Sequence, residues 1–385
     1  MKILFVCPQN PFITYSGAHQ RTYLLLSAMV EAGLDVDVIY IDKKDPNEDE
    51  CLKSKVRILA TFNYRSTRFD EICYKLRYLI GFGLKLKRKS LNDVISYAVS
   101  SNQYDYVFAR YIDIVQEANL QSFSNLIVDI DDSPYEVYKV RYNNEKNRLL
   151  KLWYRIASIR ASKYMRRYEA TFKVAFYPQS KQCLLANSVY LPNIPFAKPC
   201  DYPDTALKSK YFLYVGVLSW MPNYLGLDSF IDNVWPRIIT QHPDMQLIIV
   251  GKGLSNQLSS KWGAVQGVKL LGFVDDLSKI YKEARAIVVP IYQGGGTNIK
   301  VLEALKYGKA LVVTPHATRG FDEVLRNREN VLIADSDKQF GDYLIELIES
   351  DDLVKRLSAI GPQIIQNHFS EETFYRIIKS TFAKL

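Results

Sequence analysis

Short apolar runs alternate with longer segments of mixed polarity along the chain. Strands that alternate with helices argue for α/β domains built on parallel sheets. The pattern predicts strands at residues 2–7, 35–41, 105–109, 126–130 and 173–177 in the first half, and at 211–216, 246–250, 268–272, 286–290 and 310–314 in the second. Each half therefore looks like a Rossmann-type domain.

A proline cluster separates the two halves. Four prolines fall between residues 191 and 203, where helix-forming residues are few, and this is typical of a linker. At 385 residues the chain is long enough for two domains of ordinary size. We therefore expect one domain at residues 1–198 and a second at residues 199–371.

The most informative segment is a glycine-rich stretch between the predicted strands 286–290 and 310–314. Residues 294–296 are three consecutive glycines, whose backbone N–H groups can approach a ligand closely. Residues 297–307 then read as a helix, and Gly308 is suited to end it. A glycine-rich loop that opens onto a helix N-terminus favours an anion, because unpaired N–H groups and the helix dipole both attract negative charge.

This motif resembles the nucleotide-sugar site of the retaining glycosyltransferases with the two-domain GT-B fold, in particular glycosyltransferase family 4. Other segments resemble the same family: the first strand at 2–7, the loop and helix from Ser16 to Gly33, and the strand ends at 214–220 and 247–253. The resemblance implies two Rossmann-like domains that face each other across a cleft. It also implies a C-terminal helix, residues 372–385, that packs back on the first domain.

The resemblance further implies which residues hold the donor. They are Gly17, Gly216, Lys252, Gly294, Gly295, Gly296, Thr297, Asn298, Ile299, Lys300 and Glu303. Glu303 lies about 9 Å along the helix from residue 297, at ~1.5 Å per residue, where its carboxylate accepts hydrogen bonds from ribose hydroxyls; a solvated helix glutamate is the alternative. The family often has a second glutamate eight positions earlier, but this chain has Gly295 there, which leaves the identity of the donor sugar open.

Three residues are candidates for catalysis. Lys252 and Lys300 would stabilise the departing diphosphate, although Lys300 also fits a surface lysine whose stem packs on apolar neighbours. Asp132 would act as a base toward an acceptor hydroxyl. The alternatives for Asp132 and its neighbours Asp129 and Asp131 are a divalent-cation site or a helix cap before Ser133. The family works without a catalytic metal, so neither a metal nor a cofactor is expected.

Acceptor contacts are expected from the first domain. The candidates are Arg21, Arg110 and Asp131, each placed near the end of a predicted strand or the start of a helix. His19 lies in the loop at Gly17 and His316 follows the predicted strand 310–314, although a lone histidine is more often structural. No Ser/His/Asp signature occurs in the sequence.

Cysteine use and apolar runs bear on the compartment. The five cysteines are scattered and never spaced as Cys-x-x-Cys, which indicates reduced thiols and a cytoplasmic protein. The apolar run at the N-terminus is too short for a signal peptide. No run of ~18 apolar residues is present, so no transmembrane helix is expected.

The net charge of +9 is confined to the first half of the chain. Residues 1–198 contain 29 Lys or Arg and 20 Asp or Glu, whereas residues 199–385 contain 21 of each. Residues 139–173 contain 11 basic and 2 acidic residues with apolar ones between them, and residues 75–89 repeat the pattern. Such segments suit an anionic membrane surface. Nucleic-acid binding is disfavoured because no nucleic-acid module is recognised.

These features together predict a retaining glycosyltransferase. It would move a sugar from a nucleoside-diphosphate donor to a hydroxyl of a glycan or a lipid-linked acceptor, as in surface polysaccharide or lipopolysaccharide synthesis. Its location would be cytoplasmic, with a peripheral position on the inner face of the membrane. The alternatives are a nucleotide-sugar 2-epimerase and a non-catalytic partner subunit of the same fold.

Overall fold

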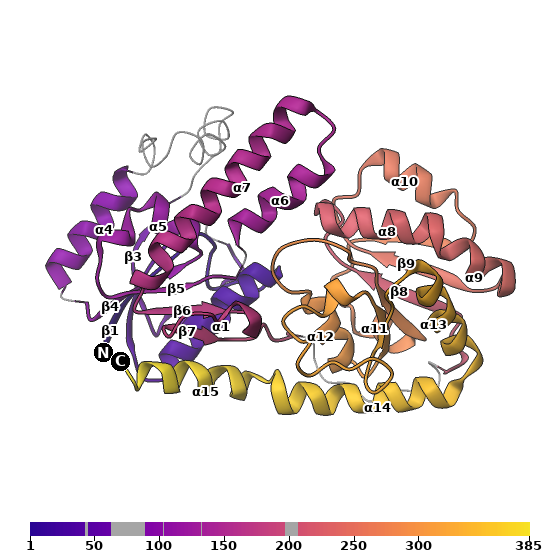
Figure 1. Ribbon diagram of the computed structural model, residues 1–385. Coiled ribbons are helices and arrows are strands. Elements are labelled where there is room, and N and C mark those ends of the chain that lie inside the picture. Colours follow the sequence, from indigo (N-terminus) through magenta and orange to yellow (C-terminus); the bar gives the residue numbers. More distant parts are fainter. Residues whose placement is uncertain (43–44, 63–88, 103, 132, 197–206) are drawn as a thin grey trace. The chain divides into compact units, whose positions relative to one another are not determined.

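The computed structural model describes residues 1–42, 45–62, 89–102, 104–131, 133–196 and 207–385. Asp132, most of the basic stretch 75–89 and residues 197–206 of the predicted linker lie outside this set. The chain divides into two compact units (Figure 1): unit 1 comprises residues 1–192 and 371–385, and unit 2 comprises residues 193–370. The predicted boundary after residue 198 falls a few residues beyond this division, outside the described residues.

Unit 1 is built on a seven-stranded sheet in the order β3-β2-β1-β4-β5-β6-β7. All pairings between these strands are parallel. The strands are β1 (Lys2–Cys7), β2 (Asp35–Tyr40), β3 (Arg57–Thr61), β4 (Tyr106–Arg110), β5 (Leu126–Asp129), β6 (Val174–Tyr177) and β7 (Ser188–Tyr190). The helices of the unit are α1 (Gly17–Glu31), α2 (Glu50–Lys53), α4 (Lys89–Asn102), α5 (Ile112–Glu117), α6 (Pro134–Asn144), α7 (Arg148–Tyr168) and α15 (Glu371–Phe382).

Unit 2 is built on a six-stranded parallel sheet in the order β10-β9-β8-β11-β12-β13. The strands are β8 (Tyr211–Val215), β9 (Gln246–Val250), β10 (Val268–Gly272), β11 (Ala286–Val289), β12 (Ala310–Val313) and β13 (Leu332–Ile333). The helices are α8 (Met221–Asn233), α9 (Trp235–Gln241), α10 (Asn256–Gly263), α11 (Ser278–Glu283), α12 (Ile299–Lys306), α13 (Asp337–Glu349) and α14 (Asp351–His368).

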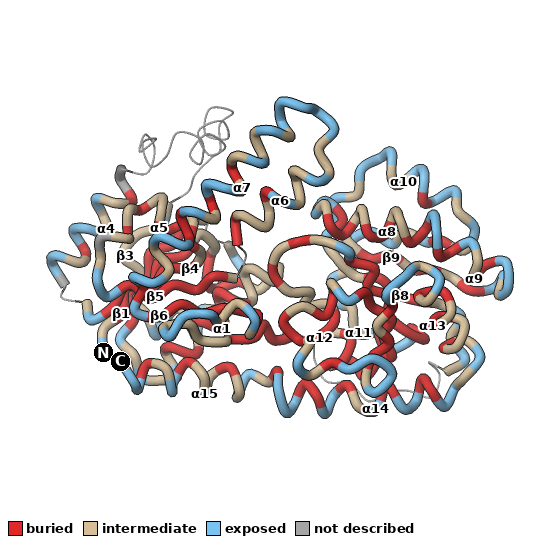
Figure 2. The backbone as a smooth tube through the Cα atoms, viewed as in Figure 1, coloured by how far each residue is buried: buried red, intermediate tan, exposed pale blue. Residues whose placement is uncertain are grey.

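The ten predicted strands are confirmed, each to within one residue at either end. Nine of them are interior strands, which are covered on both faces and therefore read as apolar runs, whereas β10 is an edge strand with mostly exposed residues; Figure 2 shows β1, β4, β5 and β8 largely buried. Three strands were missed: β3, β7 and β13. Each lies at the edge of its sheet, and β3 and β7 are only partly buried, so their sequences carry no such run.

Helix α15 completes unit 1 although it comes last in the sequence. It packs against α1 through a face that includes Phe374 and Ile378, both fully buried. The Tyr375 hydroxyl lies 2.8 Å from Ser27 Oγ on α1. Unit 1 is therefore assembled from two segments of the chain that are far apart in sequence.

Both sheets share a feature that predicts where ligands bind. The strand order reverses between β1 and β4 in unit 1 and between β8 and β11 in unit 2. In open α/β sheets, ligands bind beyond the carboxyl ends of the strands at such a reversal. Gly216 follows β8 and the glycines 294–296 follow β11, so the predicted donor loop starts at the reversal point of unit 2.

Candidate functional site

The N-terminus of α12 is left without a side-chain cap. Asn298 occupies the N-cap position, but its side chain accepts no hydrogen bond from the first turn; its amide Nδ2 lies 3.5 Å from the Ala317 carbonyl oxygen instead. Gly294 and Gly296 have φ angles of 141° and 65°, which residues other than glycine rarely adopt. The backbone N–H groups of the first turn of α12 therefore have no side-chain acceptor from the N-cap residue. Unpaired N–H groups at a helix N-terminus are what an anion site requires.

Glycines let several segments of unit 2 approach one another at this point. A Cβ atom on Gly216 would lie 2.9 Å from Lys300 Nζ, and one on Gly251 would lie 1.8 Å from the Gly216 carbonyl oxygen. A Cβ on Gly294 would lie 3.3 Å from Pro222 Cγ, in the first turn of α8. The ends of β8 and β9, the start of α8 and the loop before α12 therefore converge, with no room for a side chain at Gly251 and tight contacts at Gly216 and Gly294.

Lys300 is held inside this convergence by two neutral groups. Its Nζ donates hydrogen bonds to the Tyr214 hydroxyl and to Asn223 Oδ1, each at 2.8 Å, and lies 4.6 Å from the centre of the Tyr214 ring. Tyr214 is fully buried, and Asn223 Nδ2 donates to the Val217 carbonyl oxygen at 2.8 Å. Burial lowers the pKa of Lys300 from its usual 10.5 to about 7, and the Glu303 carboxylate only partly opposes the shift.

Glu303 lies one turn after Lys300 on α12 and is half-buried. Burial raises the pKa of its carboxyl above the usual value, and the ammonium groups of Lys300 and Lys306 oppose that rise. Within the described part of the chain, no hydrogen bond or ion pair engages this carboxylate. The side chain is therefore available to accept hydrogen bonds from a ligand.

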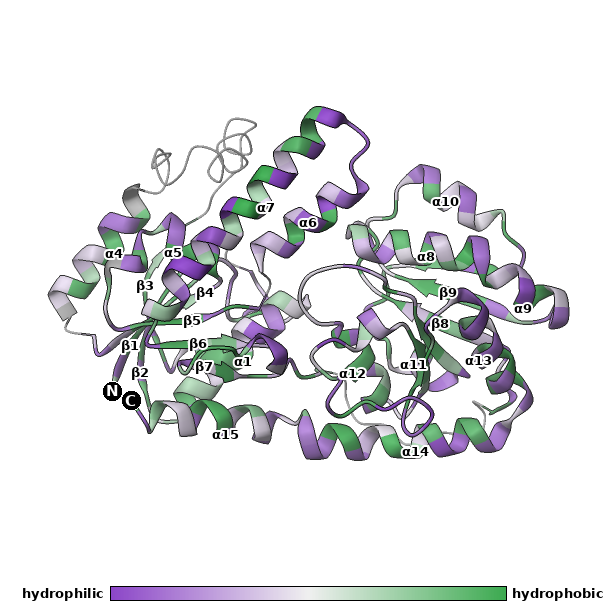
Figure 3. Ribbon diagram, viewed as in Figure 1, coloured by the Kyte–Doolittle hydropathy of each residue, from purple (hydrophilic) through white to green (hydrophobic). Residues whose placement is uncertain are grey.

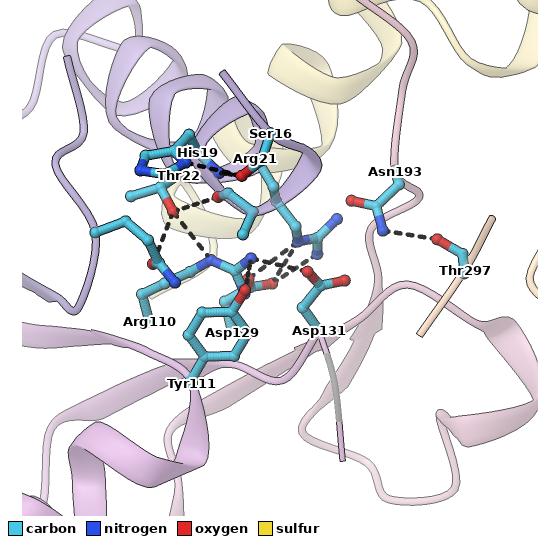
Figure 4. Close-up of polar contacts among 12 residues, drawn as sticks. Ser16, His19, Arg21, Thr22, Arg110, Tyr111, Asp129, Asp131, Asn193 and Thr297 are labelled. Carbon is cyan, nitrogen blue, oxygen red and sulfur yellow. Dashed lines mark hydrogen bonds and ion pairs between the residues drawn. The ribbon is translucent and has the colours of Figure 1, made fainter. Parts of the chain in front are cut away.

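The remaining donor candidates lie on the same loop and on the loop after β9. Thr297 Oγ1 accepts a hydrogen bond from Asn193 Nδ2 at 2.7 Å (Figure 4), and Gly295 and Ile299 are half-buried. Lys252 is exposed, and its Nζ lies 5.5 Å from the centre of the Phe273 ring. The structure thus brings Gly216, Gly294 and Lys300 together, whereas Lys252 contacts a different side chain.

His316 faces the same loop from the other side. Its Nε2 would lie 3.9 Å from a Cβ built on Gly294. Burial and the nearby Arg319 guanidinium lower the pKa of His316 to about 4, and Arg319 Nη2 donates to the Gly296 carbonyl oxygen at 3.3 Å. His316 is therefore neutral near pH 7, and Arg319 adds positive charge beside the loop.

In unit 1, the acceptor candidates form a buried charge cluster (Figure 4). Arg21 Nη2 lies 2.6 Å from Asp129 Oδ1, and Arg110 Nη1 lies 2.7 Å from Asp129 Oδ2. Arg110 Nη2 also pairs with Asp131 Oδ2 at 2.8 Å and donates to the Tyr111 hydroxyl at 2.9 Å. Asp129 and both arginines are at most 1% exposed, so this geometry supports a role in holding the sheet and helix α1 together.

Of these candidates, only Asp131 reaches the surface of unit 1, with 13% of its side chain exposed. Its neighbour Tyr111 has a φ of 70°, a conformation that costs a non-glycine residue energy and often marks functional sites. The helix-cap alternative for the aspartates is wrong where the structure describes them, because Ser133 is the N-cap of α6 and Asp129 and Asp131 pair with arginines. Asp132 lies outside the described residues.

The first turn of α1 contains the last candidates, Gly17 and His19. Gly17 is the first residue of α1, and the N-cap Ser16 accepts a hydrogen bond from His19 N. His19 Nδ1 lies 2.8 Å from Ser16 Oγ (Figure 4), and its Nε2 lies 3.5 Å from Asp42 Oδ2. Both ring nitrogens of His19 therefore have partners within unit 1.

Two site residues were missed in the sequence: Tyr214 and Asn223. Their role is to fix the Lys300 ammonium, and neither belongs to the glycine-rich motif. A signal for Tyr214 does exist, since a hydroxyl in an otherwise apolar strand needs a buried partner. Asn223 gives no such signal, because an asparagine in the first turn of a helix is ordinary.

Two further observations concern ions and membranes. Among the described residues, no group of three or more His, Cys, Asp or Glu is placed to hold a metal ion. In the same part of the chain, no helix combines the length and the apolar character needed to cross a membrane.

Comparisons with known proteins give similar sequences and similar folds. Residues 209–350 match the sequence profile of the family Glycosyl transferases group 1. An uncharacterized 44.6 kDa protein in the cps region of Klebsiella pneumoniae is 24% identical over 98% of this chain and 99% of its own. The phosphatidyl-myo-inositol mannosyltransferase of Mycobacterium tuberculosis is 31% identical over 37% of this chain and 39% of its own.

The crystal structure of Anabaena Alr3699/HepE in complex with UDP superposes with a TM-score of 0.66 at 14% identity, covering 100% of both chains. At that identity the likeness shows the fold alone, which is the GT-B arrangement of two Rossmann-like domains. The matched profile covers the whole α12 site of unit 2. The chain is therefore a glycosyltransferase of the GT-B fold, and its residues 209–350 form a Glycosyl transferases group 1 domain.

Proposed function

We propose that unit 2 binds a nucleoside-diphosphate sugar at the N-terminus of α12. The observation that carries the proposal is Lys300, an ammonium held by Tyr214 and Asn223 beside a helix start with no side-chain cap. A diphosphate would accept hydrogen bonds from the loop N–H groups and pair with Lys300. Glu303 would accept the ribose hydroxyls, which matches its lack of a partner among the described residues.

The same residues supply the chemistry of transfer. When the bond between the sugar and the diphosphate breaks, negative charge grows on the leaving group, and preorganised N–H groups with a fixed ammonium stabilise it without reorganisation. Lys252 and Asp132 are proposed as a further cation and as the base, respectively. Retention at the anomeric carbon is proposed from the resemblance to family 4, and no metal or cofactor is assigned.

The acceptor is proposed to be a hydroxyl of a glycan or a lipid-linked sugar. The Klebsiella relative lies in a cps region and the mycobacterial relative is named for a phosphatidylinositol acceptor, which supports synthesis of a surface polysaccharide or glycolipid. Unit 1 is proposed to bind this acceptor, with Asp131 as the candidate contact that is partly exposed. We place the enzyme in the cytoplasm, peripheral to the inner face of the membrane.

The test is calorimetric titration with UDP, GDP, CMP and dTDP, followed by the sugars of whichever nucleotide binds. Glu303→Ala should weaken that binding at least about tenfold, because a carboxylate that accepts two hydroxyl groups contributes ~1.5–3 kcal/mol. Glu283→Ala, which removes an exposed glutamate from α11, is the matched control and should bind as the wild type does. If no nucleotide binds, the proposal is wrong.

Product analysis separates the alternatives. Incubation of the bound nucleotide sugar without any acceptor should leave the sugar unchanged, apart from slow hydrolysis. Its conversion into an isomer would identify a nucleotide-sugar 2-epimerase. Tight binding with no reaction toward glycan or lipid-linked acceptors would favour a non-catalytic subunit, the alternative suggested by Gly295 at the position of the usual glutamate.

A further inference from the structure

Helix α7 of unit 1 has an unusual charge composition. It contains no acidic residue, and Figure 3 shows hydrophilic and hydrophobic residues interleaved along its length. Its cationic residues number seven: Arg148, Lys151, Arg155, Arg160, Lys163, Arg166 and Arg167. The buried residues of α7 are Ala157, Ala161, Tyr164 and Met165, which lie on one face of the helix.

The opposite face carries exposed aliphatic side chains between the cations, and Figure 2 shows exposed positions along α7. Leu149 is 80% exposed, Leu152 53% and Ile159 49%. Together with Leu150 they account for four of the fourteen large hydrophobic residues that are exposed in the described chain. We define the α7 outer face as Arg148, Leu149, Leu152, Arg155, Ile159 and Lys163, all of them exposed.

The electrostatics of α7 point to an anion outside the chain. The N-terminus of a helix carries partial positive charge and favours acidic residues in its first turn. The first turn of α7 has none, and Arg148 is its first residue. Lys151 follows one turn later, so cations repel the dipole at the point where Leu149 and Leu152 are exposed. An anionic partner would remove this repulsion.

The combination of cations and aliphatic chains selects the partner. Nucleic acid would pair with the cations but would leave the leucines in water, since it is bound through phosphate contacts and aromatic stacking. A lipid surface satisfies both, because headgroup phosphates pair with the cations while aliphatic chains enter the acyl boundary.

We propose that the α7 outer face docks on an anionic phospholipid surface. This docking surface would give the enzyme the peripheral membrane location proposed above. The proposal rests on that part of the proposed function alone. The nucleotide site of unit 2 takes no part in it. Long Arg and Lys side chains would reach the phosphates while their stems lie along the apolar layer.

The experiment is flotation with vesicles of phosphatidylcholine alone or mixed with phosphatidylglycerol, at low and high salt. Wild type should bind only the mixed vesicles, and salt should release it. Arg148→Gln/Arg155→Gln/Lys163→Gln should lower the partition coefficient roughly a hundredfold, at the usual contribution of each cation near headgroups. Leu149→Ser/Leu152→Ser/Ile159→Ser should lower it at least about tenfold without a change in charge.

A matched control makes the same charge change elsewhere. Lys269→Gln/Lys279→Gln/Lys355→Gln removes three exposed cations from unit 2 and should leave vesicle binding unchanged. Equal loss in this control, or unchanged binding by both α7 variants, would overturn the proposal, as would binding to random duplex DNA but not to vesicles.

Nucleotide titration of every variant separates the two proposals. All variants should bind the nucleotide as wild type does, and calorimetric unfolding that matches wild type shows that unit 1, which contains α7, is folded. A wild type that binds vesicles but no nucleotide would remove the proposed function and leave this surface intact. The reverse result would remove the surface and leave the proposed function.

Discussion

Both units place charged side chains at the carboxyl end of a parallel sheet, but they use the charges differently. In unit 1, Asp129 pairs with two arginines and all three are buried. In unit 2, Lys300 donates hydrogen bonds to the neutral side chains of Tyr214 and Asn223. The carboxylate nearest to it along α12, Glu303, is half-buried. With Asp131, which also pairs with Arg110, two carboxylates balance two arginines in unit 1, whereas the groups bonded to Lys300 in unit 2 are neutral and leave its charge unbalanced.

The largest effect should come from breaking the paired cluster. Asp129→Ala would leave Arg21 and Arg110 buried without their carboxylate, which typically costs ~3–5 kcal/mol of unfolding free energy. The measurement is calorimetric unfolding of the full chain, in which the transition of unit 1 should move to lower temperature. Asp342→Ala, which removes an exposed partner of Arg237, should change unfolding little, and equal losses would contradict a special role for the cluster.

Removing the cation of unit 2 should affect binding and not folding. Lys300→Met should weaken nucleotide binding about tenfold or more, since a charge-assisted hydrogen bond contributes ~1.5–3 kcal/mol. It should not destabilise unit 2, because burial of the Lys300 charge is itself unfavourable. Lys306→Met, on the same helix, is the control for the loss of one cation near Glu303.

The pH dependence of binding sharpens the same point. The pKa of Lys300 is about 7 in the free protein, and a bound diphosphate should raise it. Above pH 7, nucleotide binding should therefore take up a proton and weaken as pH rises. Below pH 7, Lys300 is already protonated, so binding should neither take up this proton nor depend on pH through Lys300. For folding the sign is reversed: above pH 7 the folded chain binds fewer protons than the unfolded chain, so Lys300 makes unfolding free energy rise with pH.

Titration in buffers of different ionisation enthalpy measures this proton uptake. Lys300→Met should abolish it in the window above pH 7. Uptake that persists in the variant would show that another group titrates on binding. His316 is not expected to be that group, since its pKa is near 4.

A smaller effect is expected from the groups that hold the cation. Tyr214→Phe removes one of the two acceptors that position Lys300 but leaves its charge and the bond to Asn223, so nucleotide binding should weaken less than in Lys300→Met, roughly two- to tenfold. Tyr211→Phe is the matched control on the same strand, because its hydroxyl donates to the Ile280 carbonyl oxygen instead. If both variants weaken binding equally, Tyr214 does not act through Lys300.

The smallest effect is expected at Lys252. This exposed side chain contacts the Phe273 ring, and an exposed cation contributes ~0.2–1 kcal/mol to pairing with an anion. Lys252→Ala should therefore weaken nucleotide binding less than about fivefold, and high salt should abolish the difference. A loss as large as that of Lys300→Met would place Lys252 directly on the diphosphate.

The sequence predicted the sheet strands well because burial on both faces leaves a direct trace in composition. It also predicted the glycine loop and α12, since glycines and a helix stop are local signals. It could not distinguish Arg21, which is buried and paired with a carboxylate, from Lys300, which is bonded to two neutral groups, because both are cations near a helix N-terminus. That distinction depends on Asp129 and Tyr214, which are distant in sequence from the residues they contact.

Helix α15 has a consequence for the order in which the protein is made. A ribosome completes residues 193–370 before it adds the helix that covers α1, and at ~5–20 residues per second the delay is on the order of ten seconds or more. During that time the surface that Phe374 and Ile378 later cover is exposed on the nascent chain. All residues of unit 2 have therefore been synthesised before unit 1 is complete, although most of unit 1 comes first in the sequence.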